Sequence, residues 1–337
     1  MQKKEPTICF ATMCKNEEHC IEETLESVYK YIDYWVICDT GSTDKTCDII
    51  RTFFNKKNIP GELFVDEWIG FGFNKTKLFE RCYMKTDLIL HMDADDILCG
   101  EFSISNKDDY KNKIAYEVKL KRGDNDYYNL VLFNNRFKWK ICGIAHTKAK
   151  CLDNISNLEI AKFSDKNFYV LSRDTGNRSS DPEKYLKDAI LLQKQFFDTL
   201  FKDDDELNSR SVFYTAQSYK ASGDYLNAIK WYCLYLKLKD TWEEEIFESY
   251  LKIGICIKNL NGNESDIVYY FNKAKELFKD RAEPYYELGK FYFENKKHYQ
   301  AQVHFEIAKN KNHSEIITKY NLFINKNAYD GDINIYC

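Results

Sequence analysis

The sequence lacks the segments that would place a protein in or across a membrane. Among its 337 residues, no apolar run approaches the ~20 residues that a transmembrane helix needs. Residues 1–6 contain no signal-like apolar stretch and lead directly into a short strand-like run. We therefore expect a soluble protein that is located in the cytoplasm.

Cysteine pairs of metal-site or redox spacing are also missing, and so is an excess of positive charge. None of the twelve cysteines forms a C-x-x-C pair, which argues against zinc fingers and thioredoxin-like sites. Cys9, Cys38 and Cys256 lie in apolar runs, where a free thiol packs as a small hydrophobe. The net charge of −4 does not indicate the excess of positive charge that is typical of nucleic-acid-binding proteins. We expect buried, reduced thiols and no nucleic-acid partner.

The first half of the chain alternates strand and helix patterns. Strand-like runs cover residues 7–13, 34–38, 61–65 and 88–92, and amphipathic stretches separate them. This order predicts an α/β fold with a Rossmann-like parallel sheet. Shorter runs at 114–121, 127–133 and 137–141 are typical of an antiparallel extension. From residue 181 onward we expect helices and no further strand.

An acidic motif, Asp93-Ala94-Asp95-Asp96, follows the last of the four strand-like runs directly. Neighbouring carboxylates repel one another unless a cation neutralises them. Mg²⁺ and Mn²⁺ prefer oxygen ligands and often share a site with phosphates. Because open α/β sheets bind ligands at the carboxyl ends of their strands, the motif predicts a metal–phosphate site there. The alternative is a solvated acidic turn.

Polar residues also follow the other strands that we expect at this edge. Asn16 and Glu17 can hydrogen-bond a base or a ribose, and Asp39 can accept a hydrogen bond from a base. Lys75, with Asn74 beside it, can approach phosphates as a point charge. The Gly-poor turn after Asp39 matches neither a P-loop nor a G-x-G-x-x-G fingerprint. This argues against an NTPase or a dehydrogenase.

Three motifs in order resemble the family 2 glycosyltransferases of the GT-A fold. They are Lys-Asn-Glu-Glu at 15–18, Asp-Thr-Gly-Ser-Thr-Asp-Lys-Thr at 39–46 and the acidic motif at 93–96, and the similarity covers roughly residues 5–150. The resemblance implies a hexosyltransferase that uses a nucleotide-diphosphate-sugar donor, most often a UDP-sugar. It also implies a Mn²⁺ or Mg²⁺ ion and inversion at the anomeric carbon.

The resemblance also implies roles for individual residues. Asp39 would contact the base, Asp93 the ribose and Asp95 the metal. The residues expected to bind the nucleotide-sugar are Thr12, Asn16, Glu17, Asp39, Asn74, Lys75, Asp93, Ala94 and Asp95. Lys45 departs from the pattern, since the family usually has a glycine there.

A second similarity concerns residues 137–146. A subset of the family ends this segment in His-Glu, whereas this chain has His146-Thr147. The resemblance implies that His146 is a metal ligand beside Asp95, through a neutral imidazole. A purely structural His146 is the alternative, and the missing glutamate puts an acid/base role at that position in doubt.

A carboxylate base is needed to take the proton of the acceptor. Asp124, Asp126 and Asp174 are candidates, and Asp126 and Asp174 are the two that we carry forward beside Asp95 as catalytic residues. Each has the alternative reading of a turn carboxylate. Arg173 and Arg178 flank Asp174 in a stretch that either closes over the diphosphate as a lid or is a solvated linker.

The second half contains a degenerate repeat. Ala216, Gly254 and Gly289 occupy equivalent positions, with offsets of 38 and 35 residues, close to the tetratricopeptide period of ~34. Small residues allow paired helices to approach closely, and aromatics fill the groove between them. This half resembles the tetratricopeptide family and would stack about three units into a solenoid. It would serve as a protein-binding or dimer surface, or as a helical cap on the first domain.

The sequence therefore predicts a GT-A domain over residues 1–205, with its core at 5–150 and a lid or linker region at 150–205. Tetratricopeptide-like repeats would follow at 206–325 and a tail at 326–337. The expected function is metal-dependent, inverting transfer of a sugar to a glycan or polypeptide acceptor. The alternative is an inactive scaffold that recruits a partner through its repeats. A metal-dependent nucleotidyltransferase is a third possibility.

Overall fold

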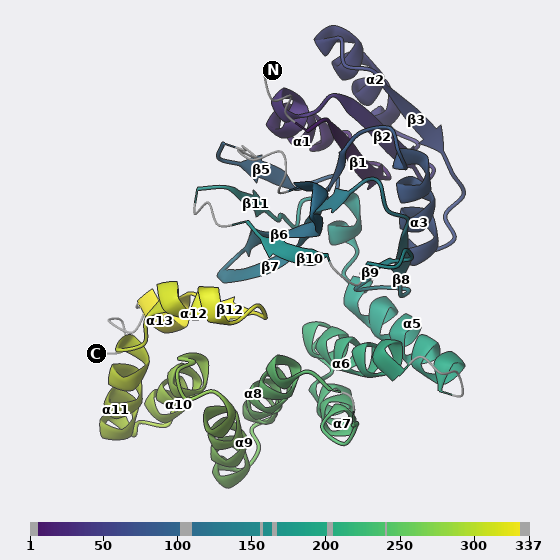
Figure 1. Cartoon of the computed structure of the whole chain (residues 1–337). Coiled ribbons are helices and arrows are strands. Elements are labelled where there is room, and N and C mark those ends of the chain that lie inside the picture. Colours follow the sequence, from purple (N-terminus) through teal and green to yellow (C-terminus); the bar gives the residue numbers. More distant parts are fainter. Residues whose placement is uncertain are drawn as a thin grey trace. The chain divides into compact units, whose positions relative to one another are not determined.

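The computed structural model divides the chain into two compact units (Figure 1). It describes residues 6–101, 110–155, 158–163, 167–200, 205–239 and 241–330. The first unit holds residues 1–123 and 128–182, and the second holds residues 124–127 and 183–337. The domain boundary suggested by the sequence, 205/206, falls at the start of a helix inside the second unit.

The first unit is built around a mixed β-sheet. Its strands are β1 (Ile8–Cys14), β2 (Tyr34–Asp39), β3 (Gly61–Val65), β4 (Leu88–His91), β5 (Ile97–Cys99), β6 (Lys113–Arg122), β7 (Asn125–Asn134), β8 (Trp139–Cys142), β9 (Lys148–Cys151), β10 (Glu159–Lys162) and β11 (Tyr169–Leu171). Its helices are α1 (Ile21–Val28), α2 (Thr46–Lys57) and α3 (Phe71–Cys82), with single 3-10 turns η1 (Tyr29–Tyr31) and η2 (Asn177–Ser180).

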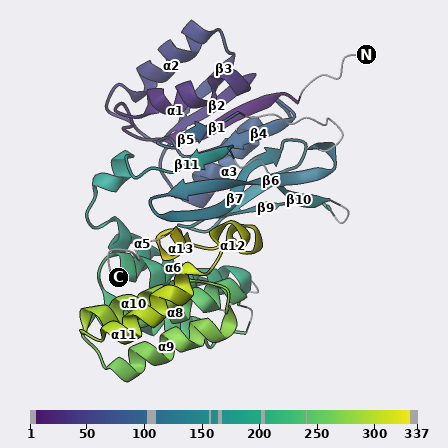
Figure 2. The ribbon, with the colours of Figure 1, turned by 90° about the vertical axis from the view of Figure 1, so that its left-hand side faces the viewer.

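The strand order of the main sheet is β3-β2-β1-β4-β7-β6-β11-β5. β1, β2, β3 and β4 pair in parallel, and β7 pairs antiparallel with β4. β10 pairs with β6, and β8 and β9 form a separate two-stranded sheet. Figure 2 shows the sheet from a second direction. The expected parallel sheet with an antiparallel extension is confirmed.

Alternation along β2 explains how helices cover both faces of the sheet. The indole of Trp35 stacks on the ring of Phe54 in α2, with the centroids 4.4 Å apart. Val36 and Cys38, which point the other way, belong to a buried cluster with Leu78 of α3. A strand that is apolar at every position is buried on both faces of its sheet. The polar residues that follow such strands therefore lie at the edge of the sheet where the strands end.

The structure contains several short strands that the sequence did not predict. β5, β9, β10 and β11 are three or four residues long. β12 (Ile324–Asn325) contradicts the expectation that no strand follows residue 181. It pairs antiparallel with residues 125–126. Such short strands form because a distant partner offers hydrogen bonds, so they leave no periodicity in the sequence.

Asp66, at the end of β3, is held by two cations from α3. Its carboxylate accepts hydrogen bonds from the Arg81 guanidinium, at 2.8 Å between Oδ1 and Nη2, and from Lys77 Nζ at 2.9 Å. The bonds from Arg81 lower the pKa of Asp66 to about 2. Because the aspartate side chain is only 4% exposed, these bonds tie α3 firmly to the sheet.

We expect Asp66→Asn to lower the free energy of unfolding by ~2 kcal/mol at pH 7. The pKa of Asp66 is lower in the folded chain, so the unfolded chain binds more protons between about pH 4 and pH 2. The stabilisation is therefore present above pH 4 and disappears as the pH falls through 2. Denaturant unfolding at pH 7, 4 and 3 measures it, with the exposed neighbour Glu67→Gln as a control. An equal loss at every pH would contradict this account.

The described part of the second unit is helical apart from β12 and the first residues of β7, with which β12 pairs. Its elements are α5 (Lys184–Thr199), α6 (Asp205–Ala221), α7 (Tyr225–Tyr235), α8 (Glu243–Asn259), α9 (Glu264–Leu277), α10 (Glu283–Glu294), α11 (His298–Lys309), α12 (His313–Lys319), β12 and α13 (Asn327–Asp330). From α5 to α11, each helix packs on the next one in chain order (Figure 1). The expected array of tetratricopeptide-like helical hairpins is confirmed. Residues 327–330 of the expected tail form α13, and residues 331–337 lie outside the described residues.

Two glycines show why the paired helices approach so closely. A Cβ added to Gly254 would lie 2.7 Å from the ring of Phe271, and one added to Gly289 would lie 2.5 Å from the ring of Phe305. Both rings are fully buried. The helices α8 and α10 therefore each use a glycine to admit a phenylalanine from the next helix.

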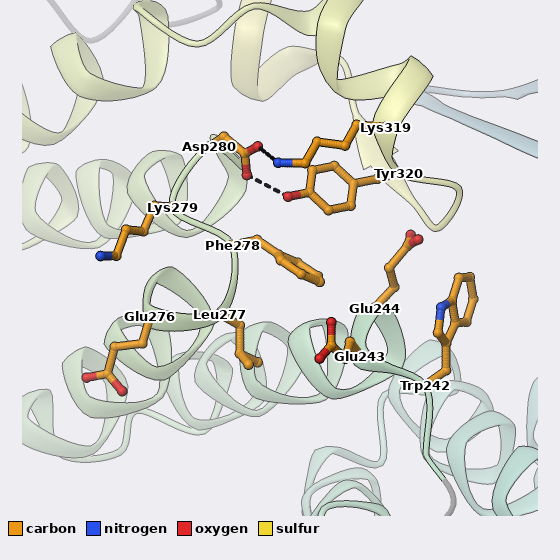
Figure 3. Close-up of a pocket in the computed structure, with 10 residues that line it drawn as sticks. All are labelled: Trp242, Glu243, Glu244, Glu276, Leu277, Phe278, Lys279, Asp280, Lys319 and Tyr320. Carbon is orange, nitrogen blue, oxygen red and sulfur yellow. Dashed lines mark hydrogen bonds and ion pairs between the residues drawn. The ribbon is translucent and has the colours of Figure 1, made fainter.

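The second unit also contains an open cavity of about 710 Å³ (Figure 3). It lies between the start of α8, the end of α9 and the end of α12, and Figure 3 shows the ion pair of Asp280 with Lys319 and the hydrogen bond of Asp280 with Tyr320 on its wall. In the part of the chain that the structure describes, no helix is long and apolar enough to cross a membrane.

Candidate active site

The polar residues expected at one sheet edge follow strands that are direct neighbours. β1 lies between β2 and β4, with Cys14 opposite Asp39 and Ala11 opposite His91. The parallel strands therefore deliver their following loops to the same edge. The structure brings together the loops that contain Asn16, Asp39 and the acidic motif.

Side-chain hydrogen bonds join the loop that follows β1 to the loop that follows β2. The carboxylate of Asp39 accepts hydrogen bonds from the amides of Gly41 and Ser42, at 3.0 and 2.9 Å, and from the Ser42 hydroxyl. The Ser42 hydroxyl also accepts the amide of Asn16 at 2.8 Å, and Asn16 Oδ1 accepts the amide of Thr43 at 2.7 Å. The side chains of Asp39 and Asn16 thus fix the backbone of the turn at residues 41–43.

Lys45 departs from the glycine that the resemblance leads one to expect, and the backbone accommodates it. Its φ angle is −83°, in a region that any L-residue adopts. Thr12 lies on β1, fully buried, and its hydroxyl has no hydrogen-bond partner in the described structure.

Asn74 and Lys75, at the start of α3, have different surroundings. The buried amide of Asn74 accepts the backbone N–H groups of Ile69 and Gly70 at 3.0 Å and donates to the Glu67 carbonyl at 2.9 Å. It therefore fixes the loop that precedes α3. Lys75 Nζ instead lies 3.0 Å from Asp93 Oδ1, so a cation reaches the acidic motif directly.

The three carboxylates of the motif differ in the direction in which their pKa values are shifted. The Lys75 ammonium lowers the pKa of Asp93 to about 2. Burial raises the pKa of Asp95, and the nearby charge of Asp93 raises it further. Burial, together with the charges of Asp93 and Asp95, raises the pKa of Asp96 to about 8. The Ala94 carbonyl accepts the Thr24 hydroxyl at 2.8 Å, which ties the motif to α1.

Glu17 lies close to Asp95. A Cβ placed on Gly176 would be 3.1 Å from Asp95 Oδ2 and 3.4 Å from Glu17 Oε1. Burial raises the pKa of Glu17, and the charge of Asp95 contributes. Two carboxylates that are hard to ionise side by side are stabilised by a cation. This donor set of hard oxygens fits Mg²⁺ or Mn²⁺.

A backbone segment of residues 173–177, which we call the strap, lies against these carboxylates. β11 pairs antiparallel with β5 so that Leu171 is opposite Ile97, and the chain then runs back past Asp96 towards Asp95. Asp95 Oδ2 accepts the amides of Thr175 and Gly176, at 3.2 and 2.8 Å. The expected lid region thus touches the acidic motif itself.

His146, the other metal ligand that the resemblance implies, is on the antiparallel β8–β9 pair. It is exposed on the turn between β8 and β9, with a φ angle of 47°. In the described part of the chain, the group of three metal-capable side chains with donor atoms within 4.8 Å of one another is Glu17, His19 and Cys20. That group includes neither Asp95 nor His146.

The candidate bases also lie in different places. Asp174 is on the strap, where its carboxylate pairs with the Arg122 guanidinium. Asp126 is buried on β7 opposite Ile324 and groups with the second unit, as does Asp124. Arg178 lies over the ring of Phe71, with 5.0 Å from its guanidinium carbon to the ring centroid.

Residues that the sequence reasoning missed hold the strap in place. Glu23 pairs with the Arg173 guanidinium, and His19 Nε2 donates a hydrogen bond to the Thr175 carbonyl at 2.6 Å. Both are polar residues just before or on the outer face of a short amphipathic helix, where periodicity marks only the buried side. No signal in the sequence singles them out.

Comparison with known families agrees with this geometry. Residues 9–102 match the sequence model described as glycosyl transferase family 2. The matched segment spans β1 to β5 and includes Asp39, Lys75 and the acidic motif. The N-terminal part of this chain is a family 2 glycosyltransferase domain.

Curated relatives share the same part of the chain. A glycosyltransferase of Rickettsia bellii (strain RML369-C), described as uncharacterized, is 32% identical over 114 residues, which is 32% of this chain and 35% of the relative. One from Rickettsia typhi (strain Wilmington), RT0209, is 31% identical over the same length, again 32% of this chain and 35% of the relative. The aligned region is about a third of these relatives.

Solved structures show remote likenesses. A mannosyltransferase from Pyrobaculum calidifontis in complex with GDP-mannose and Mn²⁺ has 13% identity and a TM-score of 0.40, covering 77% of this chain and 88% of that one. S. aureus TarS 1–349 in complex with UDP has 14% identity and a TM-score of 0.36, covering 81% and 89%. BtubC from P. vanneervenii has 23% identity and a TM-score of 0.34, covering 39% and 59%. The family assignment rests on the sequence matches.

Proposed function

We propose that this protein is a metal-dependent, inverting glycosyltransferase that moves a sugar from a nucleotide-diphosphate donor to a glycan or polypeptide acceptor. The observation that carries the proposal is the ion pair of Lys75, on α3, with Asp93 of the acidic motif, which follows β4 at the edge where the parallel strands β1, β2 and β4 end, within the family 2 segment. UDP-sugars are the donors to test first.

Asp95 is the residue proposed to hold the divalent cation, with Glu17 as its neighbour. A cation bound there supplies Lewis-acid stabilisation of the charge that develops on the leaving diphosphate. Lys75 contacts Asp93 of the same motif, where its ammonium is proposed to add positive charge near the diphosphate. The pairing of Lys75 with Asp93 orients both side chains before the donor arrives. His146 is retained as a candidate ligand only through the family resemblance.

The donor pocket is proposed to include the first two loops. The buried Asp39 and the hydrogen bonds that it makes with Gly41 and Ser42 set the shape of a turn against which a base can lie. Asn16 links that turn to the loop of Glu17. These contacts support a preorganised nucleotide site, because the loops are held before any ligand binds.

Asp174 is proposed as the general base in preference to Asp126. Its support is its place next to Thr175, whose amide donates to Asp95. The Arg122 guanidinium pairs with its carboxylate and holds the side chain in place. Asp126 is instead buried opposite Ile324 of β12 and groups with the second unit. The helical hairpins of the second unit are proposed to bind a polypeptide acceptor, a partner or a second copy.

A screen of nucleotide sugars with and without Mn²⁺ tests the function. The matching donor should raise the unfolding temperature only in the presence of Mn²⁺, because a ligand that binds the native state stabilises it. The same donor should be hydrolysed slowly when no acceptor is present. A well-folded protein that binds and hydrolyses no nucleotide sugar would favour the scaffold alternative instead.

A further inference from the structure

The strap contacts both acids that are proposed to hold the cation. Asp95 Oδ2 accepts two backbone amides, from Thr175 and Gly176, and Glu17 Oε2 accepts the amide of Asn177 at 3.0 Å. The three consecutive N–H groups therefore occupy one carboxylate oxygen of each acid. Such a row of amides is a common way to bind an anion.

Side-chain contacts hold the strap in this position. Arg173 Nε donates to the Asp95 carbonyl at 2.6 Å, and its Nη1 pairs with Glu23. The His19 imidazole donates to the Thr175 carbonyl. One nitrogen of the Arg173 guanidinium, Nη2, is buried without a hydrogen-bond partner in the described structure. Arg173 and Thr175 thus anchor the strap to residues near Asp95. The Arg173 guanidinium keeps one N–H group without a hydrogen-bond acceptor in the described structure.

Gly176 fits between the two acids because it has no side chain. A Cβ there would lie 3.1 Å from Asp95 Oδ2 and 3.2 Å from its Cγ. Mg²⁺ or Mn²⁺ binds at ~2.0–2.2 Å from a carboxylate oxygen. At Asp95 Oδ2, such an ion would need part of the space that the two amides occupy. The oxygen that accepts both N–H groups cannot keep them in place and also turn its lone pairs to a metal.

We propose that the strap is an internal competitor for Asp95 Oδ2, and that it must move off this oxygen before a divalent cation with its diphosphate can bind there. The inference rests on the proposed function, and it adds a closed state to it. The amides donate hydrogen bonds to the acids when no donor is present. A cation that arrives with a diphosphate would replace them, because the cation brings positive charge to both carboxylates at once. The freed Arg173 and the row of amides then become available to the anionic diphosphate.

Mn²⁺ binding in the absence of donor tests the proposal directly. The signal of free aqueous Mn²⁺ in electron paramagnetic resonance falls as the ion binds, so it measures affinity without any turnover. Gly176→Pro removes the 2.8 Å bond to Asp95 at a residue whose φ of −60° suits proline. Its ring also adds a Cβ only 3.1 Å from Asp95 Oδ2, so both changes disfavour the closed position of the strap. Loss of one charge-assisted hydrogen bond from the closed state should tighten Mn²⁺ binding about tenfold.

A second variant keeps the test independent of how residue 176 folds. Glu23→Ala releases Arg173 from an exposed pair, and Mn²⁺ binding should tighten about threefold, as expected for a weak surface ion pair. Glu22→Ala is the matched control, because it removes the same charge from the same helix. It should leave the Mn²⁺ affinity unchanged or slightly lower it.

The outcomes separate this inference from the proposed function. If Asp95→Asn binds Mn²⁺ as well as the natural chain does, the metal assignment fails. If Asp95→Asn loses Mn²⁺ but Gly176→Pro and Glu23→Ala bind it no more tightly, only the strap inference fails. Weaker binding in both strap variants would overturn it too, since the strap would then be part of the cation site.

Discussion

Replacing Asp95 with asparagine is expected to lower the rate of sugar transfer at least ~10³-fold, which corresponds to ~4 kcal/mol of transition-state stabilisation. Asparagine keeps the size and one oxygen of the side chain but removes its charge. The Lewis-acid contribution of the cation depends on holding it beside the diphosphate. Initial rates with a saturating donor and Mn²⁺ give the measurement.

Two comparisons make that result interpretable. Asp48→Asn removes an exposed carboxylate, 83% accessible, from α2 and should leave the rate unchanged. Excess Mn²⁺ should restore part of the activity of Asp95→Asn if weakened cation binding is the main defect. An Asp95→Asn variant with the normal rate and an unchanged requirement for Mn²⁺ would contradict the assignment of this residue.

The second large effect is expected at Arg281, a fully buried cation in the helical unit. Its guanidinium donates to both oxygens of Glu283, at 2.9 Å each, and lies 3.4 Å from Glu248. We expect Arg281→Ala to destabilise this unit by ~3–5 kcal/mol, because it leaves buried carboxylates without their partner. Urea unfolding followed by circular dichroism, which is dominated by the helices, measures the loss.

The matched control is an ion pair of the same unit that is exposed. Lys319 pairs with Asp280 at the wall of the cavity, with 60% of the lysine and 39% of the aspartate accessible (Figure 3). Lys319→Ala should cost less than ~1 kcal/mol. Similar losses for the two variants would show that burial is not what makes the Arg281 network important.

The α/β core could be predicted from the sequence because its strands are continuous apolar runs. The expected strand at 61–65 coincides with β3, and the stripe Ile21, Leu25 and Val28 is buried in α1. Cys9, Cys38 and Cys256 are buried, as their apolar surroundings indicated. The missed strands are those of two to four residues. β11, for example, is specified by its pairing with β5 and β6, which no local pattern encodes.

The site could be predicted in part for the same reason. Because the ends of parallel neighbours meet, the proximity of Asp39 and the acidic motif followed from the strand order. Three details could not be predicted: the hydrogen bonds from the strap to Asp95, the raised pKa of Asp96 and the exposed position of His146. Each depends on burial or on contacts between residues more than fifty positions apart, and single-sequence patterns do not report these.

The glycine–phenylalanine contacts of the helical unit recur one hairpin apart, at Gly254 with Phe271 and at Gly289 with Phe305. The corresponding positions of the preceding hairpin hold Ala216 and Tyr232, both fully buried. Each of these three helical hairpins thus has a small residue and a buried aromatic ring at equivalent positions. Such an array can gain or lose one module through an in-frame duplication or deletion while its neighbours keep their internal packing. The length of this unit is therefore a property that evolution, or an engineer, can change in steps of one hairpin.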